Sequence, residues 1–243
     1  MAARLVTAKR RIIEHFFAPK VENEEVVDAL VKVMTPHILK RDELAFGPRR
    51  RGQVFFLVSG CIREEAPFGH TRLWRDGTMF GRWASARSSF GSAGWTLTGS
   101  TGLSADSSDI YHLAMEHSEL CKALAQMDAS RMSMLDGVYG ASRQSPLARV
   151  ARLLLYLSDN TGRGYQTRSV EGRQVVKFIP GGFIEGPSQA DLADALALGR
   201  ATVEKVLASL RADEILARPT GKRTNRFYEI LDRDRLDEVA RGL

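Results

Sequence analysis

The residues with the clearest chemical meaning lie between positions 187 and 210. Apolar side chains recur at helical spacing in 192–196 and again in 203–210, and the glycine-containing stretch 197–199 separates them. Two short helices joined by so short a turn must pack at a steep angle, as in a helix-turn-helix. The first turn of the second helix carries Arg200, whose guanidinium can donate two hydrogen bonds to guanine. The pattern therefore predicts a surface that reads base edges in the major groove of DNA.

The two predicted helices would divide the contacts between phosphates and bases. Polar residues at the start of the first helix suit phosphate oxygens, and the start of the second helix meets base edges. The predicted phosphate contacts are Ser188 and Gln189. The predicted groove-facing residues are Gly199, Arg200, Ala201, Thr202 and Lys205.

Two short runs with strand character follow the predicted helix-turn-helix. They cover 214–218 and 226–230, and the turn between them contains glycine and several cations. Such a strand pair would form a wing beside the helices, with Lys222, Arg223 and Arg226 contacting phosphates. Each feature alone is common in proteins, but helix-turn-helix, strand pair and basic tip in this order are together much more specific for DNA binding.

The bulk charge agrees with a polyanionic partner. The chain has 243 residues, and 35 Lys and Arg against 29 Asp and Glu leave a net charge of +6. Residues 1–140 have 18 basic and 16 acidic side chains, a net of +2, whereas residues 141–243 have 17 and 13, a net of +4. The smaller C-terminal part has most of the excess, although charge alone does not identify the partner.

Composition and run lengths exclude several classes of protein. With 44% hydrophobic and 26% charged residues, the chain has the make-up of an ordinary globular protein. No apolar run approaches the roughly 20 residues that cross a bilayer, and the first residues do not have the pattern of a signal peptide. We therefore expect no membrane partner and a cytoplasmic location. Cys61 and Cys121 are too few for a disulfide framework or an iron–sulfur cluster, and we expect no metal and no cofactor.

Two other functional classes are weaker alternatives. An enzyme could use His112, which lies three residues from Asp109 and close to Ser107 and Ser108. No nucleophile elbow or oxyanion glycines accompany these residues, so we expect no catalytic residues. The other alternative is a ligand-binding or protein-interaction module whose winged helix docks a protein partner.

The N-terminal half changes in character along its length. Helical spacing over 21–39 predicts a helix with Pro36 near its end. Short aromatic and β-branched runs separated by glycines then predict an antiparallel sandwich or barrel. Residues 82–109 are rich in serine and glycine, which favours a surface loop anchored by aromatic side chains, with a remodelled ligand pocket as the alternative.

Helical spacing returns at Ser118, where apolar residues alternate four and three apart, as in a coiled coil. This pattern predicts a dimerisation helix with one interruption at Arg131, although a helix that packs only on its own domain would have the same spacing. The predicted dimer interface consists of Leu120, Leu124, Met127, Arg131, Met134 and Val138.

Three parts of the chain follow from these elements. Residues 1–117 form a β-rich sensor-like domain, 118–144 the dimerisation helix and hinge, and 145–243 the winged helix-turn-helix. Ser145 and Pro146 are expected to begin the helix after the hinge.

Several motifs give the chain a family resemblance. Val58-Ser59-Gly60, the run from Asp76 to Gly81, the long helix, Arg149 and the winged helix together make it similar to the cyclic AMP receptor protein and FNR family of bacterial transcription regulators. The resemblance implies an α+β chain with an N-terminal β-roll of the cyclic-nucleotide-binding kind. It also implies a homodimer on a near-palindromic operator in double-stranded DNA, with RNA polymerase as a candidate partner.

The departures from the family pattern concern the effector and the operator. Members that bind a cyclic nucleotide have a glycine-glutamate pair and a later arginine, whereas here Arg82 follows Gly81 and the stretch 96–100 has no arginine. Cyclic AMP is therefore not expected, and the effector stays open. Ala201 stands where family members often have an acid that accepts from cytosine, so the operator should differ from theirs.

Overall fold

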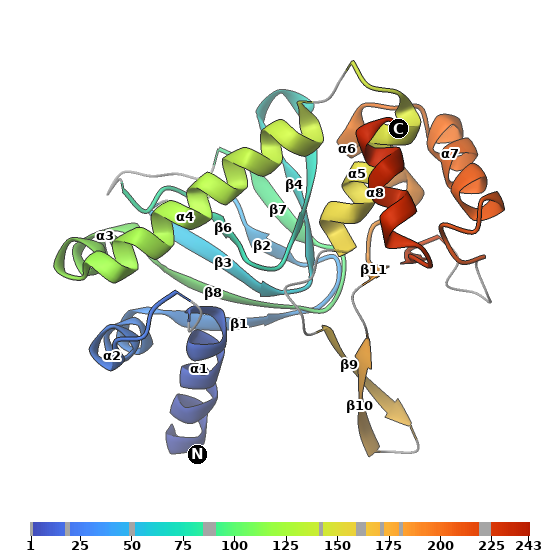
Figure 1. The fold of residues 1–243 in the computed structure, drawn as a ribbon. Coiled ribbons are helices and arrows are strands. Elements are labelled where there is room, and N and C mark those ends of the chain that lie inside the picture. Colours follow the sequence, from blue (N-terminus) through green and yellow to red (C-terminus); the bar gives the residue numbers. More distant parts are fainter. Residues whose placement is uncertain are drawn as a thin grey trace. The chain divides into compact units, whose positions relative to one another are not determined.

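The computed structural model describes residues 2–17, 20–48, 52–84, 91–140, 143–158, 164–170, 173–179, 182–218 and 225–243. The chain forms two compact units (Figure 1). The first holds Met1–His70 and Trp74–Leu135, and the second holds Thr71–Leu73 and Asp136–Leu243.

The first unit begins with two helices, α1 (Ala2–Phe17) and α2 (Glu24–Val33). The side chain of Asn23 caps α2 by accepting a hydrogen bond from the backbone of Glu25. The predicted extension of this helix to Pro36 is wrong, because α2 ends at Val33 and Pro36 lies in strand β1 (Thr35–Leu39). A proline disfavours helical backbone in the residue before it, so the chain continues extended.

Eight strands form two four-stranded sheets, with the orders β1-β8-β3-β6 and β2-β7-β4-β5, and all of their residues except the first three of β5 belong to the first unit. The neighbours in each sheet for which a register is defined run antiparallel. Gly60 and Gly77 have positive φ in the tight turns that join successive strands. The predicted β-roll is thereby confirmed. The remaining strands are β2 (Leu44–Phe46), β3 (Gln53–Ser59), β4 (Cys61–Glu65), β5 (Thr71–Arg75), β6 (Thr78–Phe80), β7 (Ala93–Thr96) and β8 (Ser100–Asp106), with the 3-10 turn η1 (Pro67–Gly69) before β5.

Part of the serine- and glycine-rich segment forms strands β7 and β8, so the predicted surface loop is wrong for these residues. The small residues make room for large neighbours: a Cβ added at Gly94 would lie 2.2 Å from the ring of Phe46, and one added at Gly102 would lie 2.2 Å from the ring of Phe55. Residues 85–90 lie outside the described part of the chain. Gly94 and Gly102 are therefore small because the rings of Phe46 and Phe55 fill the space beside them.

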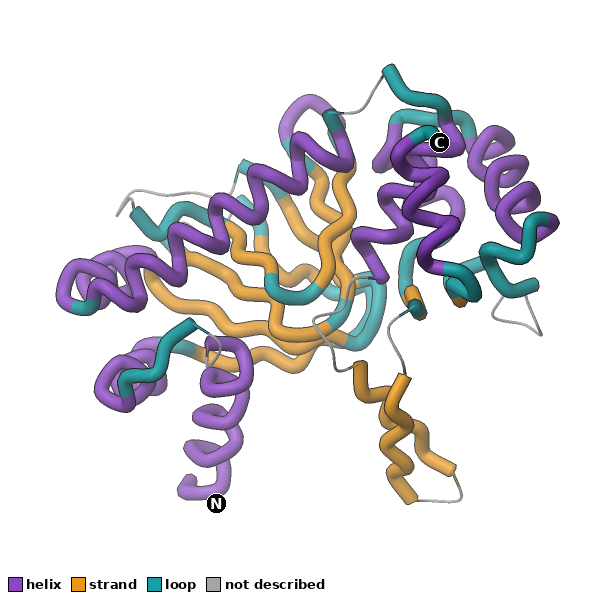
Figure 2. Tube along the Cα trace, in the orientation of Figure 1, coloured by secondary structure: helices purple, strands orange, loops and turns teal. Residues whose placement is uncertain are grey.

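Helices cover the strands of this unit (Figure 2). Phe16 and Phe17 of α1 meet Phe56 of β3 edge to face, with ring centroids 5.7 and 5.5 Å apart. After β8 the chain enters α3 (Ser107–Glu116) and then α4 (Ser118–Met134), which runs along the strands in Figure 1. A π-helical turn, η2 (Leu135–Tyr139), continues α4.

The stripe predicted as a dimer seam faces the core of its own unit. Leu120 and Leu124 are fully buried and Met127 is 3% exposed, all in one apolar cluster with residues of α1, α2 and the strands. Arg131 bonds Glu64 of β4, and Met134 packs against a second cluster between the sheets. Val138 lies in η2 and is buried. These side chains therefore pack within their own unit, because a helix that covers a sheet has the same four-three spacing as a dimer seam, and their role in a dimer interface stays a prediction.

The second unit holds the rest of the chain. Its first helix is α5 (Pro146–Ser158), and the hydroxyl of Ser145 accepts a hydrogen bond from the backbone of Ala148, as expected of a cap. Tyr139 uses its hydroxyl to bond both backbone groups of Leu73. Two residues of the predicted hinge, 141 and 142, lie outside the described residues. The further elements are β9 (Gly164–Val170), β10 (Arg173–Ile179), β11 (Phe183–Glu185), α6 (Gln189–Leu196), α7 (Arg200–Ala212), β12 (Phe227–Glu229) and α8 (Arg233–Arg241).

Candidate nucleic-acid interface

The first helix of the candidate interface, α6, begins at a capping box. The hydroxyl of Ser188 accepts from the backbone N–H of Asp191 at 3.1 Å, and the Asp191 carboxylate accepts from the backbone N–H of Ser188 at 2.7 Å. The same hydroxyl donates to that carboxylate at 2.6 Å, and Asp191 is 5% exposed. Ser188 thus defines the start of α6, a role in addition to the phosphate contact predicted for it. Its phosphate contact stays a prediction, as does that of the half-buried Gln189.

The turn between α6 and α7 is held from both sides. Ala197 ends α6 in the left-handed conformation, with φ 49° and ψ 48°. The backbone of Leu198 donates to Ala193 at 2.9 Å, and Arg149 of α5 donates to the carbonyl of Leu196. Arg149 therefore donates a hydrogen bond to one of the carbonyl groups that a helix leaves unpaired at its C-terminal end. This fixes the angle at which α7 leaves the turn.

Replacing Ala197 by glycine is expected to stabilise the second unit by about 0.5–1 kcal/mol. An L-residue pays roughly 1–2 kcal/mol in the left-handed region, part of which is offset by the greater freedom of glycine in the unfolded chain. Urea unfolding followed by far-UV circular dichroism would measure the change. Ala208→Gly, in the exposed interior of α7, is the control and should destabilise by about 1 kcal/mol. Destabilisation by both changes would contradict the prediction.

The second helix, α7, has two distinct sides. Its apolar side packs into the unit through residues that are at most 9% exposed, namely Val203, Val206, Leu207 and Leu210. Its opposite side is exposed along the whole helix and comprises Arg200, Ala201, Glu204, Lys205, Ala208 and Ser209. Gly199 is the exposed N-cap, and Thr202 is half-buried at the edge between the two sides. The structure thus brings the sequence-predicted residues of the second helix onto one surface.

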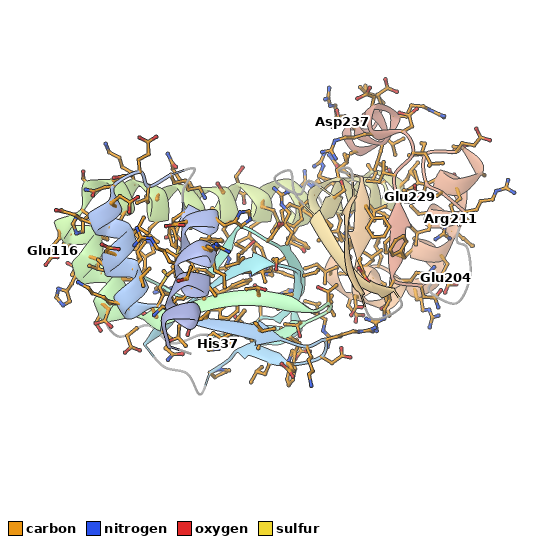
Figure 3. The ribbon with its side chains drawn as sticks, turned by 90° about the horizontal axis from the view of Figure 1, so that it is seen from below. His37, Glu116, Glu204, Arg211, Glu229 and Asp237 are labelled. Carbon is orange, nitrogen blue, oxygen red and sulfur yellow. The ribbon has the colours of Figure 1, made fainter. Side chains whose placement is uncertain are left out.

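One residue of this exposed side was missed from the sequence. Nε of Arg200 donates to Oε1 of Glu204 at 2.9 Å, with side chains 66% and 46% exposed. Figure 3 shows Glu204 on α7. The spacing of four residues between an arginine and a glutamate on one helix is the signal that could have revealed the pair.

The predicted wing is only partly formed as expected. Strand β12 pairs with β11, which precedes the helices, and 214–218 meets the second strand through a bridge between Leu216 and Ile230. The predicted pairing of 214–218 with 226–230 is thus present as a bridge, whereas the pairing of β12 with β11 was not predicted, because it joins segments more than 40 residues apart. Lys222 and Arg223 lie outside the described residues, so their phosphate contacts stay predictions.

Arg226 has a structural role in the described chain. Its Nη1 donates to the carbonyl of Gly186 at 3.1 Å and lies 3.9 Å from Oδ2 of Asp191. The guanidinium therefore ties the strand pair to the start of α6. Tyr228 of the same strand is buried, and burial raises the pKa of its phenol, which keeps the hydroxyl protonated.

Three further predictions concern catalytic residues, metal ligands and membrane-spanning helices. Ser107 is fully buried at the start of α3, whereas His112 of the same helix is exposed, so the structure does not bring them together as a catalytic group. In the described part of the chain, no three His, Cys, Asp or Glu side chains are placed to hold a metal ion. Among the helices described, none is long and apolar enough to span a membrane.

Comparison with known proteins shows which domain and which fold the chain shares with them. Residues 148–239 match the family model of the Crp-like helix-turn-helix domain. FixK2 from Bradyrhizobium japonicum shares the fold with a TM-score of 0.61 and 21% identity, over 85% of this chain and 97% of that one. TTHB099, a transcriptional regulator of the CRP family from Thermus thermophilus, has a TM-score of 0.60 and 22% identity over 84% and 96%. No curated protein sequence matches significantly.

Residues 148–239 therefore form a Crp-like helix-turn-helix domain, and the chain as a whole shares the fold of a transcriptional regulator of the CRP family. TTHA1359, a CRP/FNR-family regulator also from Thermus thermophilus, shares the fold as well, with a TM-score of 0.54 and 22% identity over 85% of this chain and 98% of that one. The resemblance inferred from the sequence is thereby confirmed.

Proposed function

We propose that this protein regulates transcription by binding specific sequences in double-stranded DNA as a homodimer on a near-palindromic operator, without cyclic AMP. The observation that carries the proposal is the exposed side of α7, where Arg200 and Lys205 stand at the start of a helix whose other side is packed into the unit. A helix presented in this way enters the major groove with its first residues at the base edges.

The geometry of Arg200 supports base recognition. Its Nε is engaged by Glu204, which orients the guanidinium and leaves the two Nη groups for a partner. Guanine offers O6 and N7 as a matching pair of acceptors in the major groove. The capping box of α6 and the Arg149 bond at its end hold the preceding helix rigidly, so α7 would meet DNA without a large ordering cost.

The exposed face of α4 supports the homodimer. It carries the small side chains of Ala125, Ala129 and Ser133 at successive turns, together with Met132, which is 58% exposed. Small residues let two helices approach closely along a two-fold axis. Binding two half-sites on one side of the DNA requires two copies of α7 about 34 Å apart, in successive major grooves.

The interior of the first unit supports independence from cyclic AMP. Glu64 is 3% exposed and accepts from Trp74 Nε1 at 2.7 Å, Ser92 Oγ at 2.6 Å and Arg131 Nη2 at 3.2 Å. The guanidinium carbon of Arg131 lies 4.8 Å from the Trp74 ring centroid. The guanidinium of Arg131 and the carboxylate of Glu64, both part of the chain itself, therefore join α4 to β4, and Arg131 also contacts Trp74 of β5. Equal operator affinity with and without added cyclic AMP is the expected result.

Arg200→Ala tests the proposed function directly. Loss of a bidentate contact to guanine should cost about 1–3 kcal/mol of discrimination at one base pair and relax specificity there. The measurement is a binding selection from randomised duplex, followed by titration of the selected site and its single-base variants. Arg241→Ala is the matched control, since Arg241 is also 66% exposed and also pairs with an acid four residues away, on α8.

Salt dependence separates this proposal from a protein-docking role. A protein that neutralises several phosphates loses affinity steeply as salt rises, with a slope set by the number of contacts. Wild-type protein that binds selected and random duplex with equal affinity, and whose affinity is the same after Arg200→Ala, would overturn sequence-specific recognition.

A further inference from the structure

Glu204 stands out because it places a carboxylate in the middle of the surface that would face DNA. It lies one helical turn after Arg200, beside Lys205 and on the exposed side of α7 (Figure 3). Phosphates repel a carboxylate, so an acid at this position costs affinity unless it meets a hydrogen-bond donor. The donors available in the major groove are the amino groups of cytosine and adenine.

Helix stability does not account for the pair that Glu204 makes with Arg200. An arginine four residues before a glutamate is the less favourable order on a helix, because it places the cation toward the positive end of the dipole. The first turn of α7 contains no acid, and its N-cap is Gly199, which makes no side-chain cap bond. Exposed pairs of this kind contribute little to folding.

The hydrogen bond between the two side chains leaves atoms on each of them that can bond a further partner. Arg200 uses Nε, so both Nη groups remain, and the bond is made to Oε1 of Glu204, so Oε2 remains. Residues four apart are separated by about 6 Å along the helix axis, which is less than two base-pair steps, and the hydrogen bond brings the two side-chain ends closer still. An arginine and a glutamate so arranged can serve neighbouring base pairs together.

We propose that Glu204 is a specificity-determining residue: its carboxylate accepts a hydrogen bond from the amino group of a cytosine next to the guanine that Arg200 contacts. This inference rests on the proposed function and names part of the operator. Glu204 would thus supply the acid that is absent at position 201, since Ala201 lies on the same exposed side three residues earlier. The expected half-site therefore contains a guanine and a cytosine at neighbouring pairs, read by two residues that orient each other.

The test compares binding selections from randomised duplex for wild type, Glu204→Gln and Glu204→Ala. Wild type should prefer cytosine at the second position by roughly 5- to 150-fold. Glu204→Gln should change that preference to adenine, because a glutamine side chain matches the N6 and N7 groups of adenine. Glu204→Ala should remove the preference, retain the guanine at the first position, and raise affinity for random duplex severalfold. Asp237→Ala, which breaks the matched ion pair on α8, should leave the selected sequence unchanged.

The outcomes separate the inference from the function on which it rests. If wild type selects a site and both Glu204 variants select the same site, sequence-specific binding stands and the role of Glu204 is overturned. If Glu204→Ala loses the guanine instead of the cytosine, Glu204 only positions Arg200, and the base contact is overturned. If wild type selects no site, the proposed function itself fails. Circular dichroism would verify that the variants, changed at an exposed residue, keep the fold.

Discussion

Arg131→Ala is expected to lower the free energy of unfolding of the first unit by about 3–5 kcal/mol, the usual cost of removing one partner of a buried ion pair. The substitution leaves the carboxylate of Glu64, 3% exposed, with the two neutral donors Trp74 and Ser92 and without its cation. It also removes a guanidinium whose central carbon lies 5.3 Å from the ring centroid of Phe80. The loss would therefore come from an uncompensated charge and from lost packing together.

Tryptophan fluorescence during urea unfolding isolates this effect. The chain has three tryptophans, Trp74, Trp83 and Trp95, and all belong to the first unit. Lys122→Ala, at an exposed position of the same helix, is the control and should change stability by no more than about 0.5 kcal/mol. The double change of Arg131→Met with Glu64→Leu should restore most of the loss, because no buried charge remains. A loss below about 1 kcal/mol in Arg131→Ala would contradict a buried, paired role.

Leu124→Ala is expected to destabilise the first unit by about 2–5 kcal/mol and to leave self-association unchanged. Leu124 is fully buried in the core cluster that α4 forms with the rest of its unit, so its truncation opens a cavity there. The sequence pattern alone predicts the reverse, a weaker dimer with a stable protomer. Tryptophan fluorescence reports the stability, and sedimentation equilibrium reports the association.

Ala129→Glu provides the complementary change on the exposed face of α4. If two copies pair through this face, two like charges would meet near the two-fold axis, which costs several kcal/mol and weakens the dimer by roughly 100-fold or more. Met115→Glu, at a 55% exposed methionine of α3, is the control. A dimer weakened by Leu124→Ala and unaffected by Ala129→Glu would restore the buried stripe as the interface.

The candidate interface was predictable from sequence to the extent that its signals are local. Ser188, the apolar spacing that follows it, and the glycine-containing turn lie within 12 residues of one another, and the structure has a helix start, helix and turn at these positions. Capping and helical periodicity depend on neighbours in the chain, so they can be recognised without knowing the fold. The same is true of the tight turns at Gly60 and Gly77.

The errors arose where one local pattern fits two long-range arrangements. Small residues at 93–106 suit a loop as well as strands beside large rings, and only the positions of Phe46 and Phe55 distinguish them. The partner of β12 depends on where β11 lies, and the two are joined by the helices between them. Glu204 was overlooked because an acid has no obvious place on a DNA-facing helix until its bond to Arg200 is seen.

By itself, the sequence determined the order of the elements, the helix-turn-helix and the family resemblance, because these follow from spacing, caps and turns that act over a few residues. The tertiary structure decided which side of α4 faces the core, what Arg131 binds, and which side chains share the exposed side of α7. An apolar stripe in the sequence indicates that one side of a helix packs against another apolar surface. Only the folded chain shows whether that surface belongs to the same unit, because burial depends on residues that are distant in the sequence.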